Sequence, residues 1–152
     1  MAEFVGTGSV TQEVALNNPI LFDATIPCNR GCVIHEDGTG NFILRGVTSN
    51  CFARYQLNYS GNIAVPTGGA VTAIGLAIAV NGETRPSSLA VFTPQAVDEL
   101  GNVSCTAIIT VPKGCCFNIS VRYVDATVSD PAVTPTPTID VSNSNLTITR
   151  IA

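Results

Sequence analysis

The chain has 152 residues, a formal net charge of −4 at pH 7, and only 12% charged residues against 45% hydrophobic ones. This length fits one domain with a core of its own, and the acidic balance excludes a basic face for a nucleic-acid partner. The most apolar run, residues 70–80, is shorter than the roughly 20 residues that span a bilayer, so we also expect no membrane partner.

The shortage of charge has a further consequence for the surface. Soluble domains usually carry about a quarter of charged residues, and this chain has about half of that share. Too few charges remain to cover the whole surface of a monomer. We therefore expect copies of the chain to cover part of it in an obligate oligomer, whose interfaces resemble a halved core.

The first eight residues form a separate segment in this interpretation. Phe4 and Val5 stand among small residues there, which is too little apolar surface to fold alone. We expect residues 1–8 to be an N-terminal arm that a partner orders, with Phe4 and Val5 as its docking side chains. Residues 9–152 then form a single domain, and no secretory leader is visible at the start of the sequence.

From residue 10 onward, apolar side chains recur with period two, which is the pattern of β-strands, and period 3.6 is nearly absent. Residues 73–80 alternate large and small apolar side chains, so both faces of that strand should be covered. Strands are predicted over residues 10–16, 20–26, 42–47, 51–61, 73–80, 89–93, 105–111, 116–124 and 146–152.

Turn signals separate these strands. Asp37-Gly38 and Asn81-Gly82 supply positive φ angles, and Pro112-Lys113-Gly114 combines a fixed φ with glycine. The prolines within residues 129–138 favour an extended loop. Short strands with tight turns predict an all-β fold, a two-sheet antiparallel jelly-roll sandwich of about eight to ten strands.

Four stretches carry a resemblance to a known family. They are "VIHEDGTGNFIL", "LAIAVNGETRPSS", "TVPKGCCFNISV" and "NLTITRIA". In this order they resemble the hairpin, the strand–turn–strand units and the closing strand of trimeric jelly-roll domains of the tumour-necrosis-factor type. The chain is most similar to the C-terminal domain of collagen-like exosporium glycoproteins and to related bacteriophage capsid-decoration and head-fibre proteins. The resemblance implies a homotrimer in which one sheet of each protomer faces a threefold axis.

Aromatic side chains on two predicted strands have two interpretations. Tyr55 and Tyr59 share one strand face, and Phe117 and Tyr123 share another. In a trimer these four side chains could line the threefold axis, whereas in one protomer they could form the sandwich core. The alternation along a strand does not distinguish a face buried by a neighbour from a face buried by the other sheet.

The cysteine-rich stretch before residue 46 suggests a metal or redox site. Cys28, Cys32 and His35 are zinc-ligand types, but their spacing lacks the second ligand pair of structural zinc sites. No helix follows to make a low-pKa thiol, and residues 36–41 offer too few oxygen ligands for calcium. We predict no metal and no cofactor, with His35 at a strand end, a turn over Asp37 to Gly40, and a local Cys28–Cys32 disulfide under oxidising conditions.

No catalytic motif appears in the sequence. The chain has one histidine, no Gly-x-Ser-x-Gly elbow and only scattered carboxylates, so we expect no enzyme. The expected function is that of a non-catalytic virion structural protein, a trimeric decoration or fibre-head knob of a bacteriophage particle assembled in the host cytoplasm. Its partners would be its own copies, a capsid or other virion protein, and a host-surface glycan or protein. The alternative is a trimeric adhesin or binding domain on a bacterial cell or spore surface.

Overall fold

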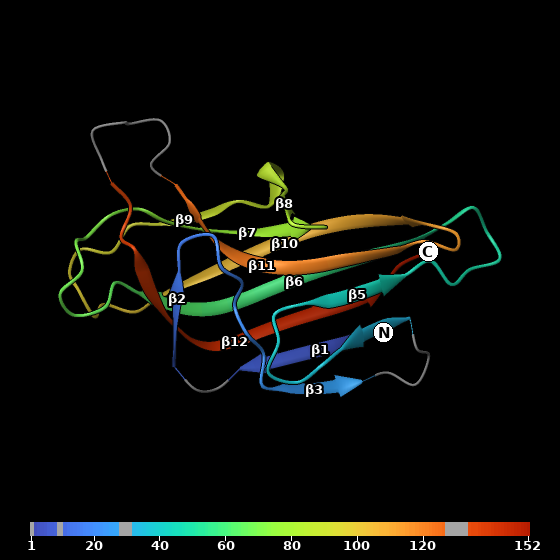
Figure 1. Ribbon diagram of the computed structural model, residues 1–152, viewed down its shortest axis with the longest axis horizontal. Helices are drawn as coiled ribbons and strands as arrows, with labels where there is room; N and C mark the ends of the chain where they lie inside the picture. Colours follow the sequence, from blue (N-terminus) through green and yellow to red (C-terminus); the bar gives the residue numbers. More distant parts are fainter. Residues whose placement is uncertain (1, 9–10, 28–31, 127–133) are drawn as a thin grey trace.

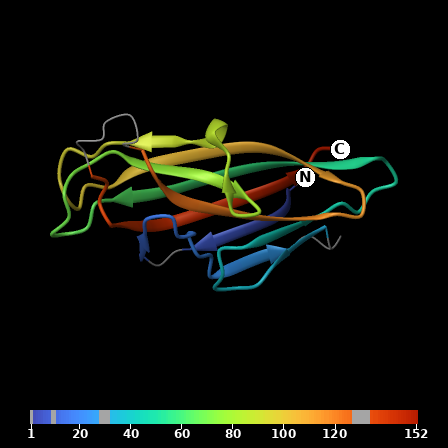
Figure 2. The same cartoon turned by 45° about the horizontal axis from the view of Figure 1, so that its top comes forward.

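A computed structural model describes the backbone of residues 2–8, 11–27, 32–126 and 134–152, and the side chains of these residues outside 2–8 and 24–27. Two antiparallel six-stranded sheets lie face to face (Figures 1 and 2). The first sheet has the order β10-β6-β12-β1-β3, with β2 also paired to β12. The second has the order β4-β5-β11-β7-β8, with β9 also paired to β7. The predicted all-β, two-sheet jelly roll is confirmed.

The strands of the first sheet are β1 (Ala2–Gly8), β2 (Gln12–Ala15), β3 (Ala24–Pro27), β6 (Phe52–Ala64), β10 (Gly101–Pro112) and β12 (Thr138–Arg150). Those of the second are β4 (Val33–His35), β5 (Phe42–Arg45), β7 (Ile74–Val80), β8 (Glu83–Thr84), β9 (Ala90–Phe92) and β11 (Cys116–Asp125). Among the described residues, the only helical element is the short 3₁₀ turn η1 (Pro86–Ser88). None of them therefore forms a helix long enough to cross a bilayer.

Strand β6 connects the edge strand β10 to the rest of the first sheet. It pairs with β10 in unbroken register from Phe52↔Pro112 to Ile63↔Gly101, and with β12 on its other side. Its side chains alternate between buried and outward-facing positions along nearly the whole strand, as the sequence predicts. This alternation arises because successive Cβ atoms of a strand point to opposite faces of the sheet.

Strand β7 is buried at every position, which confirms the prediction from its apolar composition. One face contributes to the core between the sheets, and the connection through η1 lies beside the strand. Ser88 of η1 is buried, and its hydroxyl accepts a hydrogen bond from the Ile78 amide at 2.9 Å. The turn that leaves β7 has positive φ at both Asn81 and Gly82, which is the geometry that this dipeptide predicts.

The predicted N-terminal arm is wrong as a description of the backbone. Residues 2–8 form β1, which lies inside the first sheet between β12 and β3. The segment pairs with strands that come from distant parts of the sequence, so its local lack of apolar surface does not keep it out of the domain. The side chains of Phe4 and Val5 lie outside the described ones, and their docking role stays a prediction.

Placing proline at position 5 tests whether β1 belongs to the sheet. Val5 is paired on both sides, to Thr147 and to Ile26, and proline cannot donate to a ladder. We expect Val5→Pro to lower the free energy of unfolding by about 2–3 kcal/mol, measured by thermal and chemical denaturation. Val5→Thr keeps the backbone donor and is the matched control. Equal stability of the two variants would show that residues 2–8 are an unpaired arm.

Candidate functional site

The corner around His35 is a hairpin held by ring stacking and a hydrogen bond. His35 ends β4, its ring stacks on Phe42 at 4.1 Å between centroids, and its Nε2 lies 2.9 Å from the Thr39 carbonyl oxygen. Gly38 has a φ of +85°, as the predicted turn requires. No group of three or more histidine, cysteine, aspartate or glutamate side chains within the described part of the chain could hold a metal ion. Cys28 lies outside the described residues, so its disulfide with Cys32 stays a prediction.

The three tyrosines lie in the core of a single protomer. Tyr55 and Tyr123 are fully buried, and Tyr59 is 1% exposed. The interpretation in which these three line a threefold axis is therefore wrong, because the facing sheet of the same chain already covers them. Phe117 is only partly buried and packs against the margin of the core.

Each tyrosine hydroxyl has a partner inside the sandwich. Tyr55 donates to the Arg45 carbonyl oxygen at 2.6 Å, and Tyr123 donates to the Thr136 carbonyl oxygen at 2.6 Å. The Tyr59 hydroxyl lies 3.1 Å from the Ser144 hydroxyl. These bonds offset the cost of burying a phenol, and each joins the tyrosine to a segment outside its own strand.

Burial also shifts the acidity of these groups. It raises the pKa of Tyr123 to about 12, with the Asp125 carboxylate adding to the shift, and it raises the pKa of Tyr59 well above its usual value. Burial raises the pKa of the Cys105 thiol to about 11, and its sulfur lies 3.3 Å from the Leu76 carbonyl oxygen. At neutral pH all three groups are protonated, so none is a ready nucleophile or base.

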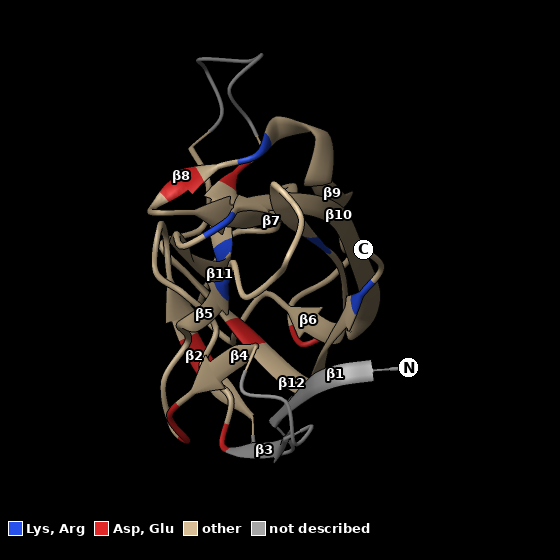
Figure 3. Ribbon diagram, turned by 90° about the vertical axis from the view of Figure 1, so that its right-hand side faces the viewer, with Lys and Arg blue, Asp and Glu red and all other residues tan. Residues whose placement is uncertain are grey.

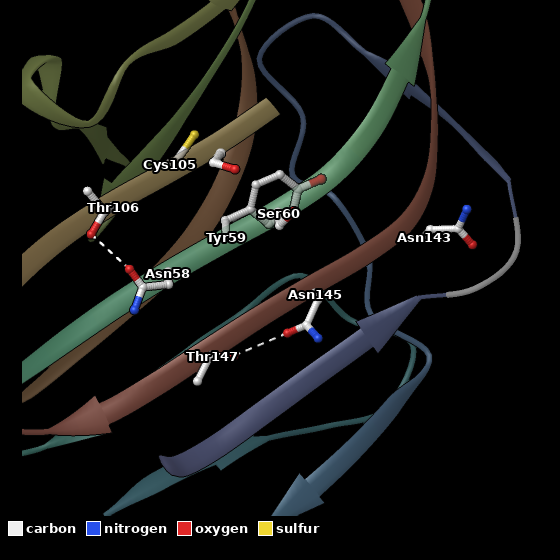
Figure 4. A pocket seen from close by; sticks show the side chains of 9 residues that line it. Asn58, Tyr59, Ser60, Cys105, Thr106, Asn143, Asn145 and Thr147 are labelled. Carbon is white, nitrogen blue, oxygen red and sulfur yellow. Dashed lines mark hydrogen bonds between the residues drawn. The ribbon is translucent and has the colours of Figure 1, made fainter. Parts of the chain in front are cut away.

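The accessible candidate site is the outer face of the β10–β6–β12 sheet. An open depression of about 500 Å³ lies there, with Tyr59 and Cys105 in its floor (Figure 4). The rest of its lining consists of uncharged polar residues from the three strands: Asn58, Ser60, Ser104, Thr106, Asn143, Asn145 and Thr147. The register places those of the regular ladder in rows across the sheet, so that Asn58 has Thr106 on one side and Thr147 on the other, whereas Asn143 lies in the register shift of β12.

Hydrogen bonds order the rows of this polar face. The Thr106 hydroxyl donates to the Asn58 Oδ1 at 3.0 Å, and the Thr147 hydroxyl donates to the Asn145 Oδ1 at 3.2 Å (Figure 4). The lining residues carry amide and hydroxyl groups and no ionisable group that could act as an acid or base at neutral pH. Such a face can hydrogen-bond to neutral polar partners, but it offers no arrangement for general acid–base catalysis.

The same face becomes apolar toward the end where β6 begins. Ile108 of β10 is 63% exposed, and Phe52 and Ile151 are also exposed there. The Arg54 guanidinium lies 4.9 Å from the centre of the Phe52 ring. Large apolar side chains are also exposed toward the opposite end of the sandwich, where β9 approaches the start of β10: Leu89, Val91 and Leu100. We refer to these six side chains as the apolar rim.

The sequence alone does not single out this face. The signal was present, because the residues between the inward-facing ones on residues 51–61 are the polar ones that now form the rows. An outward polar residue on one strand predicts nothing by itself, however. Only the pairing of β6 with β10 and β12 brings these residues from three distant segments into one surface.

Comparisons with solved structures identify the fold. The globular domain of zebrafish complement 1qA protein matches with a TM-score of 0.64 at 11% identity, covering 100% of this chain and 98% of that one. Eiger TNF from S. frugiperda matches with a TM-score of 0.63 at 10% identity, covering 99% and 93%. Murine APRIL matches with a TM-score of 0.62 at 9% identity, covering 99% and 100%. No protein-family model and no curated protein sequence matches the chain.

The class that the fold defines is therefore the jelly roll of tumour-necrosis-factor and C1q globular domains. The four sequence stretches predicted this class, and the structural matches over nearly the whole chain confirm it. At identities near 10% the likeness concerns the fold alone, because function resides in the surfaces that different chains place on a common core.

The buried hydroxyls predict unfolding in alkali. The unfolded chain releases tyrosine protons from about pH 10, whereas the folded chain holds those of Tyr59 and Tyr123 to higher pH. The two buried hydroxyls therefore contribute their full share to the free energy of unfolding below about pH 9. This contribution is lost as the pH rises through their folded-state pKa values. We expect tyrosinate absorbance and loss of the β-sheet circular dichroism signal to appear together above pH 10. Tyrosine ionisation near pH 10 with an intact β signal would contradict the buried assignment.

Proposed function

We propose that this chain is a non-catalytic structural or binding domain that works as a homotrimer. The observation that carries the proposal is the exposure of Ile108 on the outer sheet face, together with the rest of the apolar rim, in a chain with only 12% charged residues. Figure 3 shows the charged residues scattered along the ribbon, with long uncharged stretches between them. Apolar surface of this kind is stabilised when another copy covers it.

The location of the apolar rim supports a contact between copies. It lies on a sheet face and on the edge where β10, the terminal strand of its sheet, meets β9 of the other sheet. An edge on one copy and a face on the next are two different surfaces, and a contact between different surfaces can close into a ring. The resemblance of the sequence to trimeric jelly rolls sets the expected number of copies at three.

Substitution of Ile108 tests the trimer. Light scattering on a sizing column should give the unaltered chain a mass near three times 15.8 kDa, and Ile108→Asp should lower it to that of one chain. An unpaired carboxylate that an interface buries destabilises the contact, whereas the same carboxylate exposed to solvent does not. Ile34→Asp is the matched control, because Ile34 is 49% exposed on the other sheet. A monomer mass for the unaltered chain at micromolar concentration would reject the trimer.

We further propose that the trimer is a virion component, a decoration or fibre-head knob of a bacteriophage particle assembled in the host cytoplasm. Support comes from the resemblance of the four sequence stretches to bacteriophage structural proteins. Because β1 is part of the sheet, docking to a capsid protein would use the loops or the outer polar face rather than a free N-terminal arm. The second candidate is a surface adhesin, which the hydrogen-bonding capacity of the outer polar face favours.

Fractionation separates these two roles. A virion component is expected to co-sediment with purified phage particles, to resist washing, and to be missing from particles made without its gene. The comparison requires immunodetection of the chain in particle and cell-envelope fractions of the same culture. Recovery on intact cells or spores, and none on particles, would replace the virion role with the adhesin.

A further inference from the structure

The described cysteines fall into two groups with different surroundings. Cys32 and Cys105 are buried, and each has its sulfur in contact with a hydrogen-bonding partner inside the protein. Cys51, Cys115 and Cys116 are exposed and carry free thiols. All three exposed cysteines lie in or directly beside two connections, residues 46–51 and 113–115. These connections cross between the sheets at one end of the sandwich (Figure 1).

The two connections run side by side. Residues 46–51 lead from β5 in the second sheet to β6 in the first, and the turn at 113–115 leads from β10 in the first sheet to β11 in the second. Three backbone hydrogen bonds join them: the Gly46 amide to the Cys115 carbonyl at 2.8 Å, the Gly114 amide to the Gly46 carbonyl at 3.1 Å, and the Lys113 amide to the Cys51 carbonyl at 2.9 Å. A Cβ on Gly46 would collide with the Pro112 carbonyl oxygen, so the contact is close.

Cys51 and Cys115 are the two cysteines whose backbone carbonyl groups accept hydrogen bonds in this contact. Cys51 lies opposite Lys113, one step beyond the Phe52↔Pro112 pair of the β6–β10 ladder. The turn then folds back, since the Cys115 amide donates to the Pro112 carbonyl at 3.0 Å and Gly114 has a φ of +79°. Such a turn brings its first and fourth Cα atoms within about 7 Å. Cys116 is one residue further along, opposite Arg45, and projects to the other side of its strand.

We propose that Cys51 and Cys115 form a reversible dithiol–disulfide site that bridges the two connections. The co-reactant is a small-molecule disulfide such as oxidised glutathione. One cysteine thiolate attacks it, giving a mixed disulfide and one reduced glutathione. The second cysteine thiolate then attacks the protein sulfur of the mixed disulfide, forms the Cys51–Cys115 bond and releases the second reduced glutathione. The two thiol protons are taken up by the two glutathione thiolates, so the protein is oxidised by two electrons and glutathione is reduced by two.

The bridge has a structural consequence. In the reduced chain, the three backbone hydrogen bonds join the two connections at this end. The disulfide adds a covalent closure between residues 51 and 115 that limits the unfolded chain. It therefore makes the stability of the domain depend on the redox state around it, and this holds for a monomer as well as for a trimer.

Peptide mapping of the full-length chain tests the site directly. Reduced protein is incubated with graded ratios of oxidised to reduced glutathione, acid-quenched, alkylated and digested with trypsin. Cleavage after Arg45, Arg54, Lys113 and Arg122 gives peptides 46–54 and 114–122, each without Cys28, Cys32 or Cys105. We expect these two peptides to be linked by a disulfide, and the midpoint of thermal unfolding to rise by roughly 5–15 °C with the link.

Single substitutions decide which sulfurs are joined. Cys51→Ser and Cys115→Ser should abolish the linked peptide and the rise in unfolding temperature, whereas Cys116→Ser should retain both. All three positions are exposed, so serine should leave the reduced fold intact, and circular dichroism checks this. Loss of the link only in Cys116→Ser would overturn the pairing. The absence of a linked peptide at every glutathione ratio, or a link found only between two chains on a non-reducing gel, would overturn the site.

Discussion

The pairing of β6 with β10 and β12 is the constraint on which the rest of the structure depends. It places the alternating side chains of three long strands in register, so that the inward rows are mostly apolar and the outward rows around Asn58 and Ser60 are polar. A shift by one residue would turn the buried tyrosines outward and the asparagines inward. The core and the outer face are therefore two results of the same register.

The tyrosine hydroxyls complete this arrangement, because each of them bonds to a segment outside its own strand. The Tyr55 hydroxyl reaches the backbone at Arg45, close to one connection between the sheets, and the Tyr123 hydroxyl reaches Thr136 just before β12. These bonds are directional, whereas the apolar contacts around them are not. The apolar contacts hold the two sheets together, and the hydrogen bonds fix the orientation of one sheet against the other.

The same alternation determines which side chains face outward, and these side chains form surface regions of different chemical character. Uncharged polar rows occupy the middle of the outer face, and the two parts of the apolar rim lie toward opposite ends of β10. Exposed thiols occupy the end where the chain crosses between the sheets. A fold shared at about 10% identity with complement and tumour-necrosis-factor domains leaves these surfaces free to differ. The roles proposed above therefore rest on the surfaces and their chemistry.

The sequence by itself determined the strand content, the burial of both faces of β7, the turns at Gly38 and Asn81-Gly82, and the fold class, because these depend on local period and turn chemistry. Only the tertiary structure decided three other points: that residues 2–8 are a sheet strand, that the tyrosines belong to the core of one protomer, and that the connections carrying Cys51 and Cys115 are hydrogen-bonded to each other. Each of these depends on which distant strands pair, and alternation along a strand shows that a face is buried without showing what buries it.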